Sequence, residues 1–398
     1  MKSDTLFEAV LGNGKTLKSG PGGSILTWSI ESDYLISTDA WSFDFVSATA
    51  DDRSALELMP VELYLDGRLQ LAGRVDVTRK GKSGKVVSVS GRDYIADFVE
   101  GQVDPSVKIA EGDRLDQVIL QVLKPYGVVA IEEPERLTTE RTGKPPSNKL
   151  PKLVKADMQN NRPQPNSSAY QYCNHVLARH GYTLQPSVNR SLVSIEYPNY
   201  LQSPVVDIVR LEGGRGGNVI ESEAVRDCSS FPTYAKFIGS AGKAVETASA
   251  TKHEWSLHAI APGLAEDIRQ VVTKWCWNGL RLPKNAPNMA KGELYRLMTF
   301  QDKLAKTPAQ IACGVTRAAF DQLKKSLSYE VRLFGTKDPK TEVTYAINTM
   351  ATVADDIADV HEMLWCYSCH RQGGDDGCTT AMKFWRPGSY QIDKEGHG

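Results

Sequence analysis

Alternation of apolar and polar residues over the first hundred positions most limits how this chain can fold. The apolar members of two such runs are Leu26, Trp28 and Ile30, and Trp41, Phe43 and Phe45. A period of two places successive side chains on opposite faces of a strand, so one face is buried and the other is wet. The pattern predicts a β barrel or antiparallel sheet in residues 1–100.

A hairpin is predicted at Asp66-Gly67, because alternating apolar residues precede and follow this pair. Both central residues of a type I′ turn need positive φ, which Asp and Gly tolerate. A last strand is expected over residues 85–90, ending at Gly91-Arg92-Asp93. A short helix over residues 94–99 then closes the domain.

The spacing of apolar residues changes to that of helices after residue 100. Asp113 is a candidate N-cap for a first helix that Pro125 ends. Ser167 or Ser168 caps a second helix, with Gly181 at its C′ position. Two strands, 182–185 and 192–197, follow. Residues 101–204 are therefore predicted to form a small α/β domain.

A long segment within that domain, residues 132–166, carries six prolines, many charges and few large apolar groups. It cannot bury enough apolar surface to hold a core of its own. We expect an exposed loop that can be removed without unfolding the protein, and limited proteolysis should cut there first.

The rest of the chain is predicted to be mainly β again. Strands are expected over residues 205–211, 219–226, 234–239 and 327–333, and a helix begins at Thr307-Pro308. The predicted layout is a second β barrel from residues 205–262 and 300–387, a helical insertion at 263–299, and a C-terminal tail at 388–398. The fold class is thus mainly β with α+β: two β barrels flank a small α/β domain.

Composition narrows the function classes. The 398 residues suggest two to four domains, and 47 basic against 48 acidic residues argue against a strongly basic nucleic-acid-binding domain. No run of 18 or more apolar residues occurs, so no membrane insertion is expected. The first residues carry no visible secretory signal. We expect a protein made in a cytoplasm.

Enzyme motifs fail on inspection. His253 and His258 flank Glu254 with one residue too many for a helical HExxH zinc site. Gly14-Lys15-Thr16 lacks the first glycine of a P-loop, and Gly242-Lys243 is followed by Ala244, which has no hydroxyl for Mg²⁺. No paired carboxylates stand out. We therefore predict no catalytic, cofactor-binding or metal-binding residues, and no enzyme.

The one constellation that could hold a metal is Cys366, Cys369, His370 and Cys378. Reduced packing residues, a disulfide formed after lysis, and a zinc or iron–sulfur site are the three interpretations. The segment has the alternation of a strand, where residues three apart point to opposite faces. We predict that Cys366, Cys369 and Cys378 are metal-free.

Several segments, in the right order, resemble the baseplate hub proteins of contractile phage tails, the family that includes the phage Mu-like tail protein and late-control-type hubs. Residues 86–99 resemble the end of that family's first barrel, and 166–197 its middle domain. The segments 218–239, 309–335 and 353–387 resemble its second barrel and C-terminal end. The long loop 132–166, the insertion 263–299 and the extra cysteines depart from the pattern.

The resemblance implies a structural virion protein: a trimeric baseplate hub with two tail-tube-like barrels per chain. Three chains would present six similar barrels to the sixfold tail tube or a tube-adaptor ring, and hold the trimeric spike protein on the other side. The implied partners also include baseplate wedge proteins. The implied location is the phage tail baseplate, assembled in the host bacterial cytoplasm.

Other functions remain open at this point. The nearest is the hub of a bacterial contractile injection system. A hub-associated cell-wall hydrolase and a carbohydrate-binding adhesin are further alternatives. At most weak, non-specific DNA contact is expected in the lumen of a trimer, at about 10⁻⁴ M or poorer, because no basic stripe follows the predicted strands.

Overall fold

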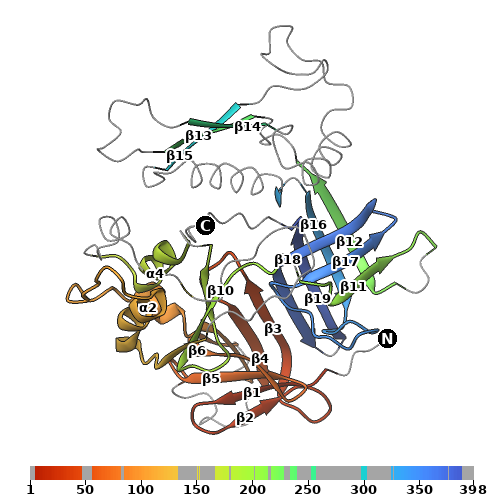
Figure 1. The fold of residues 1–398 in the computed structure, drawn as a ribbon. Helices are drawn as coiled ribbons and strands as arrows, with labels where there is room; N and C mark the ends of the chain where they lie inside the picture. Colours follow the sequence, from red (N-terminus) through yellow and green to blue (C-terminus); the bar gives the residue numbers. More distant parts are fainter. Residues whose placement is uncertain are drawn as a thin grey trace, which may run out of the picture.

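The computed structural model describes most of the chain outside residues 228–326, with smaller gaps elsewhere. The described residues are 5–46, 56–81, 85–132, 150, 152, 166–178, 181–200, 202–213, 217–227, 234–239, 252–256, 297–302, 324–325, 327–374 and 376–387. Strands dominate this part of the chain, so the prediction of a mainly β protein is confirmed (Figure 1).

A 13-stranded sheet forms the body of the protein. Its N-terminal strands are β1 (Phe7–Leu11), β2 (Thr16–Lys18), β3 (Ile25–Asp33), β4 (Ala40–Val46), β5 (Pro60–Leu65), β6 (Arg68–Lys80) and β7 (Val86–Asp93). Its C-terminal strands are β11 (Val206–Arg210), β12 (Val219–Arg226), β16 (Leu327–Phe334), β17 (Met350–Asp355), β18 (Val360–Gly374) and β19 (Gly377–Trp385). The predicted turn between β5 and β6 is confirmed, with φ of 51° at Asp66 and 74° at Gly67.

The sheet consists of two strand groups with the same order. The first strand group runs β3-β4-β7-β6-β5-β1, and the second runs β12-β16-β19-β18-β17-β11. Bulges match as well: the ladders skip Leu26 in β3 and Ile220 in β12, and Asp76 in β6 and Tyr367 in β18. The groups differ at one end, because β1 is antiparallel to β5 while β11 is parallel to β17.

Strand β18 joins the two groups. Its first part pairs with β17, and its last seven residues pair with β3 of the first group. The hydrogen-bond ladder therefore continues from one group into the other. Within the described residues the sheet does not close on itself, so the prediction of two closed barrels is not confirmed.

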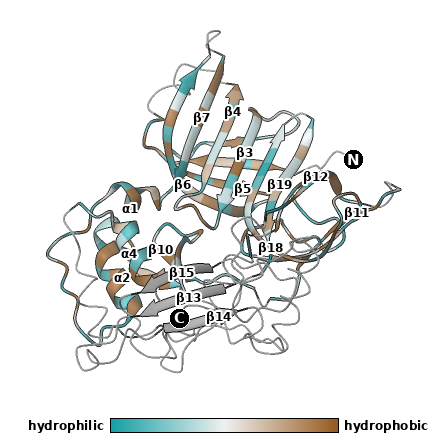
Figure 2. Cartoon of the chain, turned by 90° about the horizontal axis from the view of Figure 1, so that it is seen from above, coloured by the Kyte–Doolittle hydropathy of each residue, from teal (hydrophilic) through white to brown (hydrophobic). Residues whose placement is uncertain are grey.

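Each strand group has its own apolar core, as the predicted alternation requires. Trp41, Phe43 and Phe45 of β4 are at most 2% exposed in the first core. Tyr329 and Phe384 are fully buried in the second. Figure 2 shows the resulting alternation of apolar and polar residues along the strands. Trp28 and Trp41, two of the apolar members of the predicted alternation, are buried core residues, and Trp365 is fully buried as well.

The α/β unit lies between the strand groups in the sequence and forms a third core. Its elements are α1 (Ala96–Glu100), α2 (Leu115–Leu123), η2 (Lys124–Tyr126), β8 (Ala130–Glu132), α4 (Ala169–Ala178), β9 (Thr183–Pro186) and β10 (Leu192–Glu196). The strands form a sheet of order β8-β10-β9. Both α2 and α4 bury one apolar face, which is brown in Figure 2.

The caps of these helices follow the predictions with one correction. Ser168 Oγ accepts a hydrogen bond from the Gln171 N–H at the start of α4, and Gly181 has a φ of +80° beyond its end. The N-cap of α2 is Arg114 rather than Asp113. The Asp113 carboxylate instead accepts a bond from the Ala110 N–H, one turn earlier.

Two predictions, about the strand 234–239 and about the segment 132–166, need correction. Residues 234–239 do form a strand, β13 (Tyr234–Gly239), but it pairs with β14 (Lys252–Ser256) and β15 (Leu297–Asp302) in a separate sheet, not with the large one. In the segment 132–166, Leu150 is only 4% exposed and packs in the core of the α/β unit. The expectation of an exposed loop is wrong at that residue. The predicted start of a helix at Thr307-Pro308 and most of the predicted helical insertion at 263–299 lie outside the described residues, and residues 297–299 of that insertion begin strand β15.

Candidate functional site: the junction of the two strand groups and the α/β unit

The ladder between β18 and β3 forms the floor of the place where the three parts of the chain meet, which we call the junction. Seven pairs run from Ser368 opposite Asp33 to Gly374 opposite Thr27. Gly373 lies opposite Trp28, and a Cβ at position 373 would come within 2.7 Å of the Trp28 ring. Glycine at 373 therefore lets the buried indole lie across the ladder.

A cavity of about 240 Å³ opens at the junction. Its polar lining comes from all three parts: Asp39, Gln70 and Asp93 from the first strand group, Gln185 and Glu196 from the α/β unit, and Asn348 and Arg371 from the second strand group. A cavity of this size and polarity has room for ordered water or a small polar group.

An acid pair, Asp39 and Asp93, lies on the wall contributed by the first strand group. The Asp93 carboxylate accepts hydrogen bonds from the N–H groups of Asp39 (2.7 Å) and Ile95 (2.8 Å). Burial raises the pKa of Asp39 to about 6. Burial and the neighbouring charge of Asp39 raise the pKa of Asp93. The charge of the Asp39 carboxylate disfavours ionisation of Asp93 as well.

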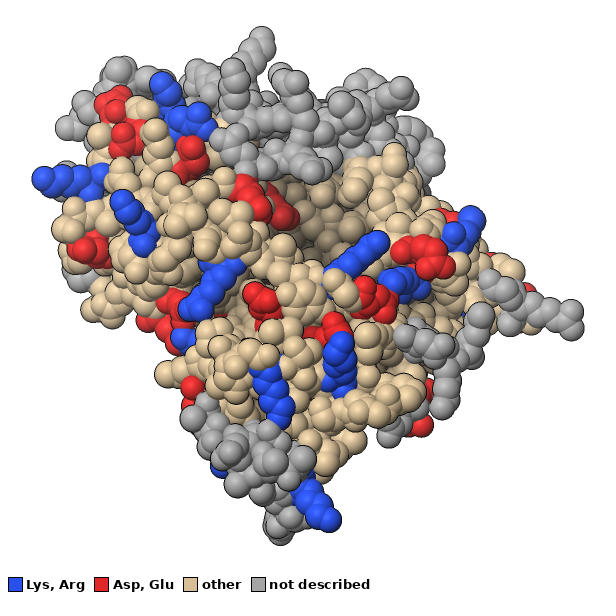
Figure 3. All heavy atoms as spheres, turned by 90° about the horizontal axis from the view of Figure 1, so that it is seen from below, with Lys and Arg blue, Asp and Glu red and all other residues tan. Residues whose placement is uncertain are grey.

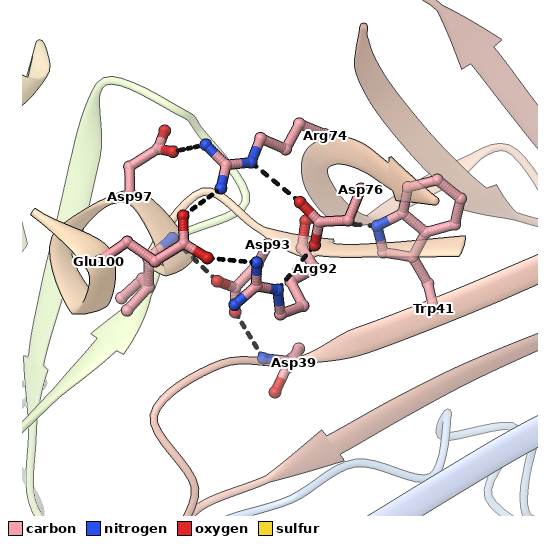
Figure 4. Close-up of polar contacts among 9 residues, drawn as sticks. Asp39, Trp41, Arg74, Asp76, Arg92, Asp93, Asp97 and Glu100 are labelled. Carbon is pink, nitrogen blue, oxygen red and sulfur yellow. Dashed lines mark hydrogen bonds and ion pairs between the residues drawn. The ribbon is translucent and has the colours of Figure 1, made fainter. Parts of the chain in front are cut away.

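An ion-pair cluster beside the acid pair fixes α1 to the sheet (Figure 4). Arg74 and Arg92, which lie opposite each other on β6 and β7, both bind Asp76, at 3.1 Å and 2.6 Å. Both also bind Glu100 of α1, at 2.7 Å and 2.6 Å, and Arg74 contacts Asp97 as well. Because each arginine binds several carboxylates, the cluster is a network rather than isolated surface pairs.

Arg371 crosses the junction from β18. Its side chain is 5% exposed, and Nη1 donates to Gln70 Oε1 at 2.6 Å. This contact joins the second strand group to β6 of the first, beyond the backbone ladder. Among the described residues, none accepts a hydrogen bond from the buried Nε of Arg371.

Asn348 connects the second strand group to the α/β unit. Its Oδ1 accepts bonds from Trp365 Nε1 (3.0 Å) and the Asn199 N–H (2.8 Å). Its Nδ2 donates to Glu196 Oε2 (3.1 Å) and to the Tyr197 carbonyl (3.2 Å). All four hydrogen-bonding positions of the amide are used, and the side chain is 7% exposed.

Aromatic side chains complete the junction. The Trp365 ring is fully buried and meets the edges of Tyr34 and Tyr200, with centroids 5.3 Å and 5.2 Å away. The ammonium of Lys324 lies 5.9 Å from the Trp365 ring centroid and 5.3 Å from that of Trp385. Such rings stabilise a desolvated cation. Tyr34, Tyr200 and Trp365 come from the three parts of the chain, so the contact holds the parts together.

The chemistry of the junction favours a structural role. Asp93 is engaged by backbone N–H groups, Asn348 has no unused hydrogen-bonding position, and the two guanidinium groups of the arginine–carboxylate cluster are paired with three carboxylates. No group of three or more His, Cys, Asp or Glu side chains with metal-binding geometry occurs among the described residues. The junction positions three parts of one chain against one another.

The three cysteines singled out from the sequence are divided between two cores. Cys366 and Cys369 are fully buried in the core of the second strand group, whereas Cys378 packs against the core of the first. Burial raises the pKa of Cys369 to about 11. The four described cysteines form no disulfide with one another. The packing interpretation fits these environments, and freedom from metal stays a prediction.

The other candidate motifs have ordinary structural settings. Gly14 has a φ of +83° in the turn between β1 and β2, and Thr16 begins β2. His253 and Glu254 lie on strand β14 rather than on a helix. His258 and Gly242-Lys243 lie outside the described residues. Sequence reasoning missed Asp39, Asn348 and Arg371. Among the junction residues it marked Gly91-Arg92-Asp93 as the end of a strand, Trp28 as an apolar strand residue and Cys369 as a candidate metal ligand.

The surface charge is mixed. Figure 3 shows basic and acidic side chains interspersed over the face that it draws. This agrees with the near-zero net charge of the chain. No helix within the described ranges is both long and apolar enough to cross a membrane.

The fold defined by these elements is that of phage tail proteins. The chain is similar in structure to the tail protein from Neisseria meningitidis MC58, with a TM-score of 0.69 and 16% identity over 98% of this chain and 100% of that one. It is also similar to the 43 kDa tail protein of prophage MuSo2 from Shewanella oneidensis, with a TM-score of 0.67 and 16% identity over 96% and 99% of the two chains.

A prophage tail protein from Listeria monocytogenes EGD-e shares the fold more distantly, with a TM-score of 0.56 and 10% identity over 96% of this chain and 94% of that one. No family model and no curated protein sequence matches the chain. At these identities the likeness establishes the fold.

Proposed function

We propose that this chain is a structural component of a phage tail, and that it acts as a homotrimeric baseplate hub. In this role it would join the sixfold tail tube, or a tube-adaptor ring, to a trimeric central spike in a contractile tail. Baseplate wedge proteins would contact its periphery. The neighbours with the same fold are described as tail proteins, which supports the general class.

The repetition of one strand order within a single chain carries the specific proposal. The first and second strand groups agree in order and in the positions of two bulges. Three chains contribute six such groups, which is the number needed to face a sixfold tube while the complex keeps threefold symmetry for a trimeric spike. A closed ring is also the usual way in which identical subunits satisfy their interfaces.

The proposed role is non-enzymatic, and the same features support it. The junction uses its arginine, carboxylate and amide groups to hold the three parts of the chain together. A hub works through interfaces and through a fixed relation between its domains, and a rigid junction provides that relation.

The test is the mass of the purified protein by light scattering, with and without the trimeric spike and the tube protein of the same tail. We expect three times 43.8 kDa, and negative-stain images with six similar units around the axis. A protein that stays monomeric alone and in the presence of both partners would contradict the proposal.

A further inference from the structure

Several strand edges of the large sheet have no partner strand in the described part of the chain, and two of them lie on the first and the second strand group at the positions that matter here. One is the end of β6, residues 76–80, which pairs with β7 on one side and lies beyond the reach of β5 on the other. The second is the outer edge of β12, which pairs only with β16. Unpaired edges expose backbone N–H and C=O groups and invite pairing with another chain.

The chain itself shows what happens at the equivalent edges. The two strand groups can be aligned by their bulges. The bulge at Asp76 in β6 corresponds to that at Tyr367 in β18, so the ends of these two strands are equivalent. The bulges at Leu26 and Ile220 likewise make β3 and β12 equivalent. The end of β18 and β3 are paired with each other in the junction. One pair of equivalent edges is therefore joined within the chain, and the other pair is left open.

We propose that the end of β6 in one copy pairs antiparallel with β12 of a second copy, in the register that β18 makes with β3. This inference rests on the homotrimer proposed above and names the strands that build it. In the chain His370 lies opposite Glu31. The bulges make Arg79 equivalent to His370 and Val225 equivalent to Glu31, so Arg79 of one copy lies opposite Val225 of the next.

The side chains at the two edges suit each other. Arg79 and Lys80 are exposed at the end of β6, whereas Glu221 and Glu223 are exposed on β12. In the proposed register Glu223 is diagonal to Arg79 on the same face, within reach of its long side chain. Val77 and Val225, which are 42% and 48% exposed, would become partly covered. Opposite charges at two otherwise open edges favour pairing between copies over pairing of like edges.

The pairing also has the right symmetry for a ring. It joins two different surfaces of the same chain, so each copy offers one β6 edge and one β12 edge. Repetition alternates the internal β18–β3 ladder with the β6–β12 ladder between copies, and closure after three copies leaves both of these edges paired. The six strand groups of the three copies are then joined side by side in one continuous hydrogen-bonded ring around the axis.

Cysteine cross-linking tests the register in the full chain. We expect the Arg79→Cys/Val225→Cys variant to form covalent trimers under mild oxidation, because opposite residues bring their Cβ atoms within disulfide range. His370→Cys/Glu31→Cys is the matched positive control, since it should form the equivalent bond within one chain. Arg79→Cys/Glu221→Cys is the negative control, because its positions are offset by four residues, about 13 Å along the strand.

The outcomes separate this pairing from the hub function. Covalent trimers from Arg79→Cys/Val225→Cys, with none from the offset pair, support the pairing. If the unoxidised protein has the mass of a trimer and the positive control forms, but the test pair does not cross-link, the pairing is wrong and the trimer stands on other surfaces. If the protein is monomeric with and without spike and tube, both proposals fall.

A charge exchange gives an independent readout. Arg79→Glu should weaken the trimer by roughly tenfold in dissociation constant, because an attractive diagonal pair becomes repulsive. Adding Glu223→Arg should restore most of the loss. Arg68→Glu, at the other exposed end of β6 where β5 already pairs, should leave the assembly unchanged. Failure of the exchange to restore assembly would count against the register.

Discussion

Asn348 is the side chain whose loss should most directly loosen the junction. Replacement with alanine removes all four side-chain hydrogen bonds and leaves the fully buried Trp365 Nε1–H without its acceptor. A buried polar group left unpaired costs about 1–3 kcal/mol. The φ of +57° at position 348 adds about 1 kcal/mol, because alanine tolerates this conformation less well than asparagine. We expect Asn348→Ala to lower the free energy of unfolding by about 2–4 kcal/mol, the sum of these two contributions.

Two further variants separate the causes. Asn166 is exposed and has a φ of +67°, so Asn166→Ala should show the backbone cost alone, about 1 kcal/mol. Asn348→Asp keeps the acceptor for Trp365 but replaces the Nδ2 donor that faces Glu196. Burial already raises the pKa of Glu196, so a second carboxylate should destabilise the protein more at pH 7 than at pH 4.

The assay combines urea unfolding followed by circular dichroism with hydrogen exchange of peptides covering residues 196–200 and 364–367. The Asn199 N–H donates to Asn348 Oδ1, so its exchange should speed up in Asn348→Ala even where global stability is retained. Asn348→Ala within 1 kcal/mol of the wild type, or Asn348→Asp equally stable at both pH values, would refute the reasoning.

Three further predictions concern the junction and the cysteines. Burial raises the pKa of Asp39 to about 6, so folding favours the protonated form of this carboxyl group. The contribution of Asp39 to the free energy of unfolding therefore falls as the pH rises from about 4 to 6. Asp39→Asn should remove up to about 3 kcal/mol of this pH dependence, which urea unfolding across that range would measure. Gly373→Ala should cost about 1–3 kcal/mol by pushing a methyl group into the Trp28 ring, and a thermal-denaturation midpoint equal to that of the wild type would contradict the crowding. Metal analysis should find no stoichiometric zinc or iron, and one metal per chain that is lost on Cys369→Ser would overturn the packing role of Cys369.

The sequence predicted local structure well because local patterns encode it. The alternation before Asp66-Gly67 and the helical spacing before Gly181 both correspond to elements of the structure. The junction could not be predicted in this way. Asp39 and Asp93 are 54 positions apart, and the ladder of β18 with β3 joins residues more than 300 positions apart. No periodicity in either segment specifies which distant edge it will pair with.

The internal repeat was hidden for a related reason. Backbone pairing gives the two strand groups the same register, but the side chains of each group pack against different surroundings. Equivalent positions of the two groups therefore carry different side chains. Arg74 and Arg92 lie opposite each other on β6 and β7, and Trp365 and Trp385 lie at the equivalent positions of β18 and β19. The first pair binds carboxylates of α1, and the second is part of an aromatic cluster.

This divergence makes a prediction about salt. Asp76, the bulge residue of β6, binds both arginines. Its equivalent in β18 is Tyr367, whose ring stacks on Trp385 with a centroid distance of 4.3 Å. Burial opposes ionisation of Asp76, but hydrogen bonds from Arg92 and Arg74 outweigh it and hold the pKa of Asp76 below its usual range. Asp76 is therefore charged at neutral pH and bound by two partly exposed guanidinium groups.

Salt should weaken the interactions of the charged bulge residue Asp76 but not those of its uncharged equivalent, Tyr367. Asp76→Asn should destabilise the protein by about 1–2 kcal/mol at low ionic strength, and by clearly less in about 1 M salt, where the Debye length is about 3 Å. Tyr367→Leu removes a stacked ring, so its cost should be the same at both salt concentrations. Urea unfolding of the two variants beside the wild type measures both differences. Equal salt sensitivity of the two variants would mean that the Arg74–Arg92 cluster is held by packing rather than by charge, and the contrast between the two strand groups would fail.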